Sequence, residues 1–180
     1  MIYTIGHSTR SLEEFIELLK EYEIGQLVDV RTIPRSRRNP QFNQETLAQA
    51  LTGQGIGYIH LPELGGLRKP RPDSVNSAWR NDSFRGFADY MGTPDFVVGL
   101  EKLIHSASES ILAIMCAEAV PWRCHRSLIG DALSVRGFEV IDIIGHGKSQ
   151  PHRLTPFAKV KGVSLVYLEP TEGEEDHQEF

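Results

Sequence analysis

The stretch SILAIMCAE, residues 110–118, decides the fold class of this chain. Its apolar run from Ile111 to Met115 has no polar interruption, which is typical of a strand buried on both faces of a parallel sheet. The run leads directly to two side chains that can do chemistry, Cys116 and Glu118. The stretch therefore predicts a sheet in which at least one strand delivers reactive groups at its carboxyl end.

Outward from this strand, short apolar runs and helical repeats alternate along the chain. The further strands that we expect span residues 2–5, 26–30, 57–61 and 138–144, with a sixth at 163–168. The helices that we expect between them start near Ser11, Asn43, Phe84, Thr93 and Cys124. This alternation predicts a mostly parallel sheet with helices on both faces, a Rossmann-like three-layer α/β fold.

The length of 180 residues suits a single domain, and we expect residues 1–168 to form it. Residues 169–180 contain six acidic residues and neither Lys nor Arg, so we expect a disordered tail there. The chain has no apolar run long enough to span a bilayer and does not open on a signal peptide, which predicts a cytoplasmic protein with no membrane partner. The two cysteines, Cys116 and Cys124, should then be free thiols.

The net charge of −5 hides a basic region. Without the tail, 19 basic residues face 18 acidic ones, and residues 31–85 contain eight Arg and one Lys against four acids. The guanidinium fork of Arg makes two-point contacts with phosphate or carboxylate that Lys does not match. A solvated basic face is the ordinary alternative, but these Arg residues lie beside Gly, Pro and His in predicted loops, which favours an anion site.

Every predicted strand from the first to the fifth ends on polar or reactive residues. In parallel sheets, ligands bind beyond the carboxyl ends of the strands. The five ends carry Gly6-His7-Ser8, Asp29-Val30-Arg31, His60, Cys116-Ala117-Glu118 and Gly145-His146. Packing alone does not explain five such ends in succession, so we expect one site at this edge of the sheet.

Cys116 is the first candidate for catalysis. A thiol between a strand and a helix N-terminus meets oriented N–H groups that favour its thiolate, and nearby Arg123 and Arg126 add positive charge. Cysteine phosphatases and rhodaneses place a Cys in this position with an Arg after five residues, whereas here six residues separate Cys116 from Arg123 and the loop contains no Gly. The alternative, of equal weight, is a small buried hydrophobe.

Glu118 and two histidines complete the candidate catalytic group. Glu118 can act as a general base or can simply form a salt bridge to Arg123 or Arg126. His7 and His125 are the histidines that we expect to assist, and Gly6 beside His7 allows a ligand to approach closely. A zinc ion held by Cys116, Cys124 and His125 is a weaker alternative, because the two cysteines are not at a usual chelating spacing.

A second group of residues should hold the ligand. The residues that we expect to bind an anion or substrate are Ser8, Arg31, Arg35, Arg38, Gly65, Gly66 and Arg126. No Walker loop, Gly-x-Gly-x-x-Gly motif or serine elbow is present, so ATP hydrolysis, nicotinamide chemistry and serine hydrolysis have no support. We therefore predict no cofactor.

Five motifs in order resemble one known family. They are Thr4-Ile5-Gly6-His7-Ser8, Val28-Asp29-Val30-Arg31 with Pro34 and Ser36, Tyr58 to Pro62 with Leu64-Gly65-Gly66, Met115-Cys116-Ala117-Glu118, and Cys124-His125-Arg126. This pattern is similar to the family catalogued as domain of unknown function 488, over nearly the whole chain up to about His146. The resemblance implies that the motifs form one site, but it supplies no reaction, since members are described as uncharacterised bacterial and archaeal proteins.

Three hypotheses about function remain open at this point. The first is an enzyme, a hydrolase or transferase, that acts on a phosphate-bearing or other anionic ligand such as a nucleotide, a phosphometabolite or a nucleic-acid end. The second is a non-catalytic nucleic-acid-binding module, in which the basic region 31–85 tracks a backbone and its aromatic residues stack bases. The third is a metal-binding protein built around the two cysteines.

Overall fold

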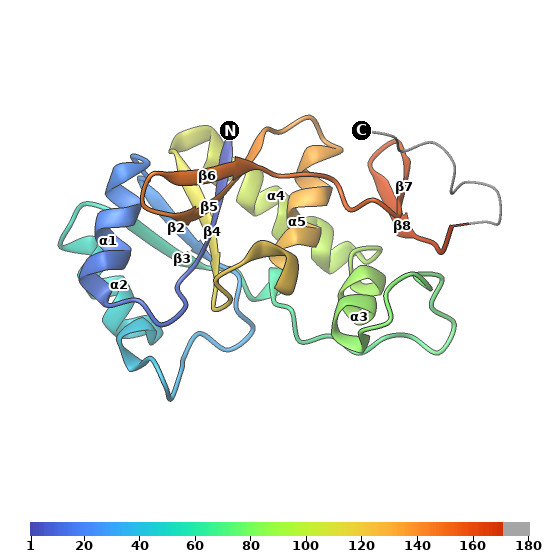
Figure 1. The fold of residues 1–180 in the computed structure, drawn as a ribbon, viewed down its shortest axis with the longest axis horizontal. Coiled ribbons are helices and arrows are strands. Elements are labelled where there is room, and N and C mark those ends of the chain that lie inside the picture. The colour runs from blue at the N-terminus through green and yellow to red at the C-terminus, as the bar shows by residue number, and fades with distance from the viewer. Residues whose placement is uncertain (171–180) are drawn as a thin grey trace.

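The computed structural model describes residues 1–170, and a six-stranded sheet lies at its centre (Figure 1). The strand order is β3-β2-β4-β1-β5-β6, with all neighbours parallel except β6, which runs antiparallel to β5. The strands are β1 (Ile2–Gly6), β2 (Gln26–Asp29), β3 (Gly57–His60), β4 (Leu112–Cys116), β5 (Val140–Gly145) and β6 (Lys148–Pro151).

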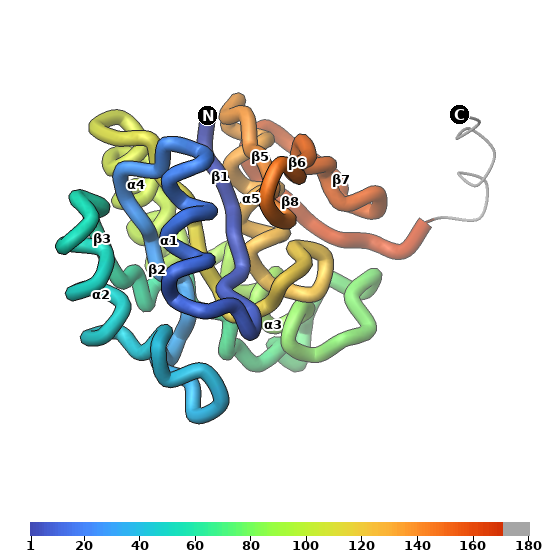
Figure 2. Tube along the Cα trace, turned by 60° about the vertical axis from the view of Figure 1, so that its left-hand side comes forward, coloured from blue at the N-terminus to red at the C-terminus, as the bar shows by residue number. Residues whose placement is uncertain are grey.

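Helices cover both faces of this sheet, as the two views in Figures 1 and 2 show. The helices are α1 (Leu12–Glu21), α2 (Gln44–Thr52), α3 (Asp82–Tyr90), α4 (Pro94–Glu109) and α5 (Arg126–Ser134), with short 3₁₀ turns η1 (Pro40–Phe42), η2 (Pro62–Leu64) and η3 (Pro121–Arg123). Strand β4 separates two cores: Ala113 and Met115 pack with α1 and α2, whereas Ile114 and Cys116 pack with α4 and α5. The predicted mostly parallel, two-sided α/β fold is therefore confirmed.

Local signals explain where several of the helices begin. The side chain of Ser11 accepts the N–H of Glu14, and that of Thr93 accepts the N–H of Phe96, so each N-cap satisfies an end donor of its helix. Pro94 then occupies the first turn of α4, where a missing N–H costs nothing. These are the positions at which the sequence predicts helix starts.

The C-terminal part differs from the prediction. The expected strand at 163–168 forms as β8 (Ser164–Tyr167), but it pairs with β7 (Ala158–Lys161) in a separate two-stranded hairpin. Strands β6 and β7 are exposed and carry no run of buried apolar residues, so periodicity did not reveal them. The predicted acidic tail lies, from residue 171 onward, outside the described residues.

The topology places a crevice between β1 and β4. The chain leaves β1 through α1 on one face of the sheet and leaves β4 through α5 on the opposite face. Parallel α/β sheets bind ligands where the connections from two neighbouring strands leave to opposite faces of the sheet in this way. Because Gly6 and Cys116 are register partners, the residues that follow both strands open into the same crevice. Over residues 1–170, the fold contains no helix with the length and apolar character needed to cross a membrane.

A candidate active site around Cys116

A cavity of about 490 Å³ lies at the carboxyl ends of β1, β2 and β4. The residues predicted for the site that line it are His7, Arg31, Arg35, Gly66, Cys116, Glu118 and His125. Arg126 does not line the cavity but lies fully buried behind Cys116. The fold thus brings together most of the residues that the sequence predicts for one site.

Arg126 contacts Cys116 where Cys116 lines this cavity. Arg126 Nη1 donates to Cys116 Sγ at 2.8 Å and to the Glu118 carbonyl at 2.6 Å. Burial by itself would raise the pKa of the Cys116 thiol, but the hydrogen bond from Cys124 and the positive charge of Arg126 outweigh burial and lower this pKa to about 7. The group that Arg126 contacts is therefore the Cys116 sulfur, and the positive charge of Arg126 favours the thiolate form of that sulfur.

Cys124 supplies the second sulfur of the site. Its Sγ lies 2.6 Å from Cys116 Sγ, and the backbone N–H of Arg126, at the start of α5, donates to Cys124 Sγ at 3.4 Å. Burial and the neighbouring Cys116 sulfur raise the pKa of Cys124 well above its ordinary value. In this pair, Cys124 is therefore the protonated thiol, and Cys116 is the sulfur that accepts its hydrogen.

His125 is held in one neutral form. Its Nε2 lies 3.0 Å from the carbonyl oxygens of both Val30 and Leu64, so Nε2 carries the hydrogen and donates to them. Burial lowers the pKa of His125 to about 4, which leaves Nδ1 unprotonated 3.6 Å from Cys124 Sγ. A Cβ on Gly66 would lie 2.5 Å from that Nδ1, so the glycine is needed for the loop to pass over the ring.

Arg31 is tied into a buried network. It makes a two-point ion pair with Asp29, at 2.9 Å from Nε to Oδ1 and 2.7 Å from Nη2 to Oδ2, and Tyr58 donates to the same carboxylate. Arg31 Nη2 also donates to the Phe42 carbonyl, and Nη1 lies 3.4 Å from His7 Nε2. These contacts engage four of its five N–H groups, so Arg31 can offer a ligand little more than one Nη1 hydrogen.

His7 orients Arg31 and is itself fixed. Its Nδ1 donates to the Ser8 carbonyl at 2.8 Å, which leaves Nε2 as an acceptor toward Arg31. The ring stacks on Phe42 with a centroid distance of 4.4 Å and is 1% exposed. Burial is the main cause that lowers the pKa of His7, so the ring is neutral at physiological pH.

Gly6 and Gly65 lie where neighbouring atoms leave no room for a side chain. A Cβ on Gly6 would lie 1.6 Å from the Glu118 carbonyl oxygen, and one on Gly65 would lie 2.4 Å from Thr32 Oγ1. Gly6 thus allows the loop after β4 to approach β1, whereas the sequence suggested that it makes room for a ligand.

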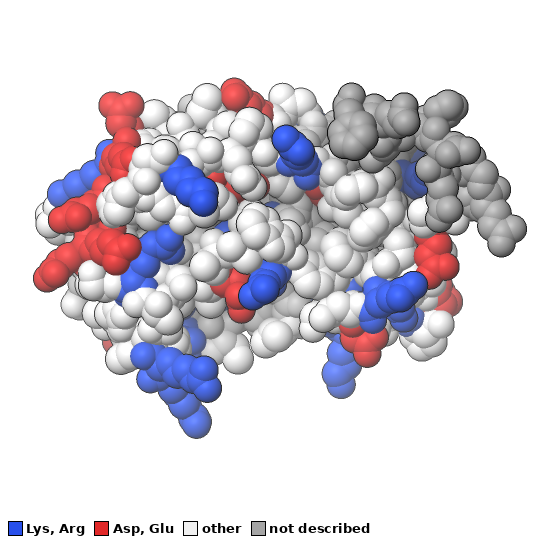
Figure 3. Space-filling model, in the orientation of Figure 1, with Lys and Arg blue, Asp and Glu red and all other residues white. Residues whose placement is uncertain are grey.

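Three charged side chains are exposed around the mouth of the cavity. Arg35, Glu118 and Arg123 all line it, and none of them has an ion pair or a side-chain hydrogen bond within residues 1–170. The basic side chains of the loop between β2 and η1 project at this edge, and acidic side chains gather over α1 (Figure 3). Arg35 and Arg123 are therefore available to a ligand, and Glu118 does not form the alternative salt bridge to Arg123 or Arg126.

Other predicted residues lie outside the cavity. Ser8 has a left-handed backbone, with φ of 50°, and donates its N–H to the Ala117 carbonyl, while Arg38 is exposed elsewhere on its loop. His60 donates to the Arg31 carbonyl, and His146 lies 2.7 Å from Glu21. Across the described residues, no three His, Cys, Asp or Glu side chains converge in a way that would hold a metal ion.

Sequence reasoning missed the residues that hold the site together. Asp29 was noted only as part of a strand end, yet it is fully buried and receives both Arg31 and Tyr58. The Cys124 thiol was assigned only to a metal, although it contacts Cys116. The available signal for Asp29 was its place inside a predicted buried strand, where a carboxylate requires a partner.

The fold and this site together define a parallel α/β protein with a cysteine at the point where the topology of the sheet switches. A family model described as domain of unknown function DUF488 matches residues 11–133, so the chain belongs to that family. The match begins after β1 and ends in α5, a narrower range than the resemblance suggested. No curated protein and no solved structure matches the chain.

Proposed function

We propose that the protein is an enzyme that uses the Cys116 thiolate to attack an anionic, phosphate-bearing ligand. The observation that carries this proposal is the 2.8 Å contact from Arg126 to Cys116 Sγ at the base of a cavity whose mouth holds the unengaged Arg35 and Arg123. A thiolate is the nucleophilic form of cysteine, and free guanidinium groups are suited to phosphate oxygens. These two features support the roles of Cys116 as the nucleophile and of Arg35 and Arg123 as the groups that position its target.

The proposed reaction has two steps. In the first, Cys116 Sγ attacks phosphorus, an S–P bond forms, and the bond from phosphorus to the leaving oxygen breaks; that oxygen keeps the electron pair and takes a proton from solvent. In the second, a water or another acceptor hydroxyl attacks phosphorus and gives its proton to the Glu118 carboxylate, and the Cys116 thiolate leaves. Glu118 suits the role of base because it lines the same cavity with an exposed side chain.

A trapping experiment tests this proposal. The protein is incubated with a panel of phosphate esters, and free product and intact protein mass are followed. Glu118→Gln should lower turnover about 10²- to 10⁴-fold while the fold persists, and should accumulate the Cys116 adduct, because the water loses its base. Cys116→Ser should show neither turnover nor adduct. Equal turnover in wild type and Glu118→Gln would exclude the role of Glu118, and turnover in Cys116→Ser would exclude the proposal.

The contact between the two sulfurs favours a second candidate function, thiol redox chemistry. A peroxide would oxidise the Cys116 thiolate to a sulfenic acid with release of hydroxide, and the Cys124 thiol would then displace water to form a disulfide. The direct contact between the two buried Sγ atoms supports this candidate. After exposure to peroxide, non-reducing peptide mapping should show a Cys116–Cys124 bond in wild type and a free sulfenic acid on Cys116 in Cys124→Ser.

A further inference from the structure

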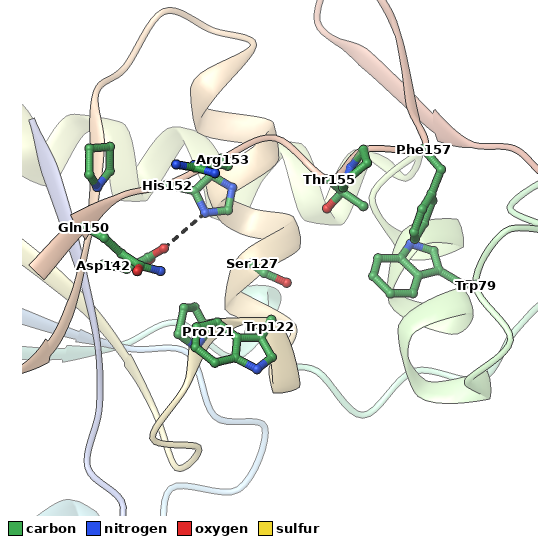
Figure 4. Close-up of a pocket in the computed structure, with 12 residues that line it drawn as sticks. Trp79, Pro121, Trp122, Ser127, Asp142, Gln150, His152, Arg153, Thr155 and Phe157 are labelled. Atoms are coloured by element: carbon green, nitrogen blue, oxygen red, sulfur yellow. Dashed lines mark ion pairs between the residues drawn. The ribbon is translucent and has the colours of Figure 1, made fainter. Parts of the chain in front are cut away.

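A second cavity, of about 600 Å³, lies beside the cysteine site on the α5 side of the sheet (Figure 4). One side is formed by residues 150–157, which comprise the last two residues of β6 and the segment after it. The η3 turn and the first turn of α5 form the other boundaries. Figure 4 shows Trp122 and Pro121 on one side and His152, Thr155 and Phe157 on the other. None of these residues takes part in the cysteine chemistry described above.

The walls of this cavity are aromatic. Trp122 is 60% exposed, an unusual position for the largest apolar side chain, and its indole lines the cavity. Trp79 and Phe157 line the other side and pack edge to face at 4.9 Å. An exposed indole opposite a fixed aromatic pair suits a flat ring, because aromatic surfaces bind each other by offset or edge-on stacking.

The floor of the cavity is polar, and its groups have hydrogen-bond partners within the protein. His152 lies between two buried carboxylates, with Nε2 at 2.8 Å from Asp131 and Nδ1 at 3.4 Å from Asp142. Thr4 donates to Asp142, and Tyr167 donates to Asp131, so both acids have partners from other parts of the chain. Two carboxylates against one imidazolium give this buried group a net charge of −1, which makes the floor a poor place for a phosphate.

The second cavity shares its wall with the cysteine site. Trp122 lines the aromatic cavity and the next residue, Arg123, lines the cysteine cavity, so their Cα atoms are only about 3.8 Å apart. On the other side, Trp79 lines the aromatic cavity and stacks at 4.7 Å on Phe84, which lines the cysteine cavity. The two cavities therefore adjoin each other at Trp122–Arg123 and at Trp79–Phe84.

We infer that the aromatic cavity binds the base of a nucleotide whose phosphate reaches Arg35 and Arg123 in the cysteine cavity. This inference rests on the proposed function and names its substrate class. The base would stack on Trp122, and the exposed polar side chains at the rim, Gln150 and Arg153, would meet its edge. The aromatic walls of one cavity suit the base of a mononucleotide, and the exposed guanidinium groups of Arg35 and Arg123 in the neighbouring cavity suit its phosphate.

Binding without turnover tests this inference. The full chain carrying Cys116→Ser is titrated by calorimetry with adenosine and uridine 5′-monophosphates, their nucleosides and ribose 5-phosphate. We expect nucleotides to bind at least about tenfold more tightly than nucleosides or ribose 5-phosphate. Trp122→Ala should weaken nucleotide and nucleoside binding about tenfold and leave ribose 5-phosphate unchanged, whereas Trp122→Phe should retain most of the affinity.

Arg35→Ala and its neighbour Arg37→Ala form a matched pair for the phosphate end. Arg35 lines the cysteine cavity and Arg37 does not, so Arg35→Ala alone should weaken nucleotides while leaving nucleosides unchanged. Two results would overturn the inference. One is an unchanged nucleotide affinity in Trp122→Ala, and the other is a nucleoside affinity that equals the nucleotide affinity. Because these titrations need no reaction at Cys116, failure of the trapping experiment with intact nucleotide binding would reject only the proposed chemistry.

Discussion

Buried charged groups lie beside both cavities, but their partners differ in access to a ligand. Around His152, the two carboxylates are Asp131 of α5 and Asp142 of β5, and both contact the imidazole. The neutral hydroxyls of Tyr167 in β8 and Thr4 in β1 also donate to them, so the cluster ties the C-terminal hairpin to the sheet. Around Cys116, the buried Arg126 is bonded to a sulfur that lines an open cavity, and exposed guanidinium groups stand nearby without partners. The difference teaches that a buried charge marks reactivity only where its partner can still meet a ligand.

Removal of a carboxylate from the His152 cluster should have the largest effect on stability. Asp131 accepts from His152, Thr155 and Tyr167, and Asp131→Ala would leave the imidazolium partly uncompensated. We expect a loss of about 3–5 kcal/mol in the free energy of unfolding, measured with urea. The exposed Asp73→Ala should stay within about 0.5 kcal/mol of wild type, and an equally small loss for Asp131→Ala would refute the comparison.

The same cluster should make stability depend on pH. The two carboxylates outweigh burial and raise the pKa of His152 to about 9, above its ordinary value of 6.5. The folded state therefore keeps a proton that the unfolded chain loses, so the contribution is complete below pH 6.5 and disappears as pH rises through 9. We expect about 3 kcal/mol less stability at pH 9 than at pH 6.5 from this group. His152→Gln should flatten the dependence of the unfolding free energy on pH between 6.5 and 9. An unchanged dependence in this variant would mean that other residues cause it.

Removal of the Cys124 sulfur should raise the pKa of Cys116. Cys124 donates to the Cys116 thiolate, and a hydrogen bond to a charged group contributes about 1.5–3 kcal/mol. In Cys124→Ala, the pKa of Cys116 should therefore rise from about 7 by about one unit or more. Thiolate absorbance against pH measures this change, and a pKa that stays near 7 would mean that Arg126 alone holds the thiolate.

Substitution of a single arginine at the mouth of the cysteine cavity should have the smallest effect, a slight loss of affinity for phosphate. Arg35→Ala should weaken the binding of inorganic phosphate by up to about 1 kcal/mol, because an exposed charge contributes little on its own. Arg37→Ala on the same loop should change nothing at the same ionic strength. Equal losses in the two variants would indicate attraction by the whole basic loop rather than a defined contact.

The parallel core and the edge that carries the site could be predicted because both follow from local patterns. The run before Cys116 and the strand ends at His7 and Arg31 are visible in the sequence, and parallel pairing brings them to one edge. The partners of the charged groups could not be predicted in the same way. The sequence offers Arg126 both as a ligand-binding arginine and as a positive charge near Cys116, and the path of the loop after β4 shows that it is buried against Cys116.

The C-terminal region escaped prediction for a related reason. His152 and Asp131 are 21 residues apart, and their contact depends on how β6 turns back along β5. Asp131 lies on an otherwise apolar stretch of α5, where a buried acid signals a distant partner without naming it. The aromatic cavity arises from the same long-range packing, so Trp79 and Phe157 could not be placed together beforehand.

Titration of the Cys116 thiol in the intact protein tests the central claim most directly. Ultraviolet absorbance of the thiolate is followed against pH in wild type and in Cys116→Ser, so that no reagent needs access to the buried sulfur. We predict a step with its midpoint near pH 7 in wild type and no such step in Cys116→Ser. A wild-type protein that forms no thiolate until pH 9, or a step near pH 7 that persists in Cys116→Ser, would contradict the assignment of Cys116 as the nucleophile.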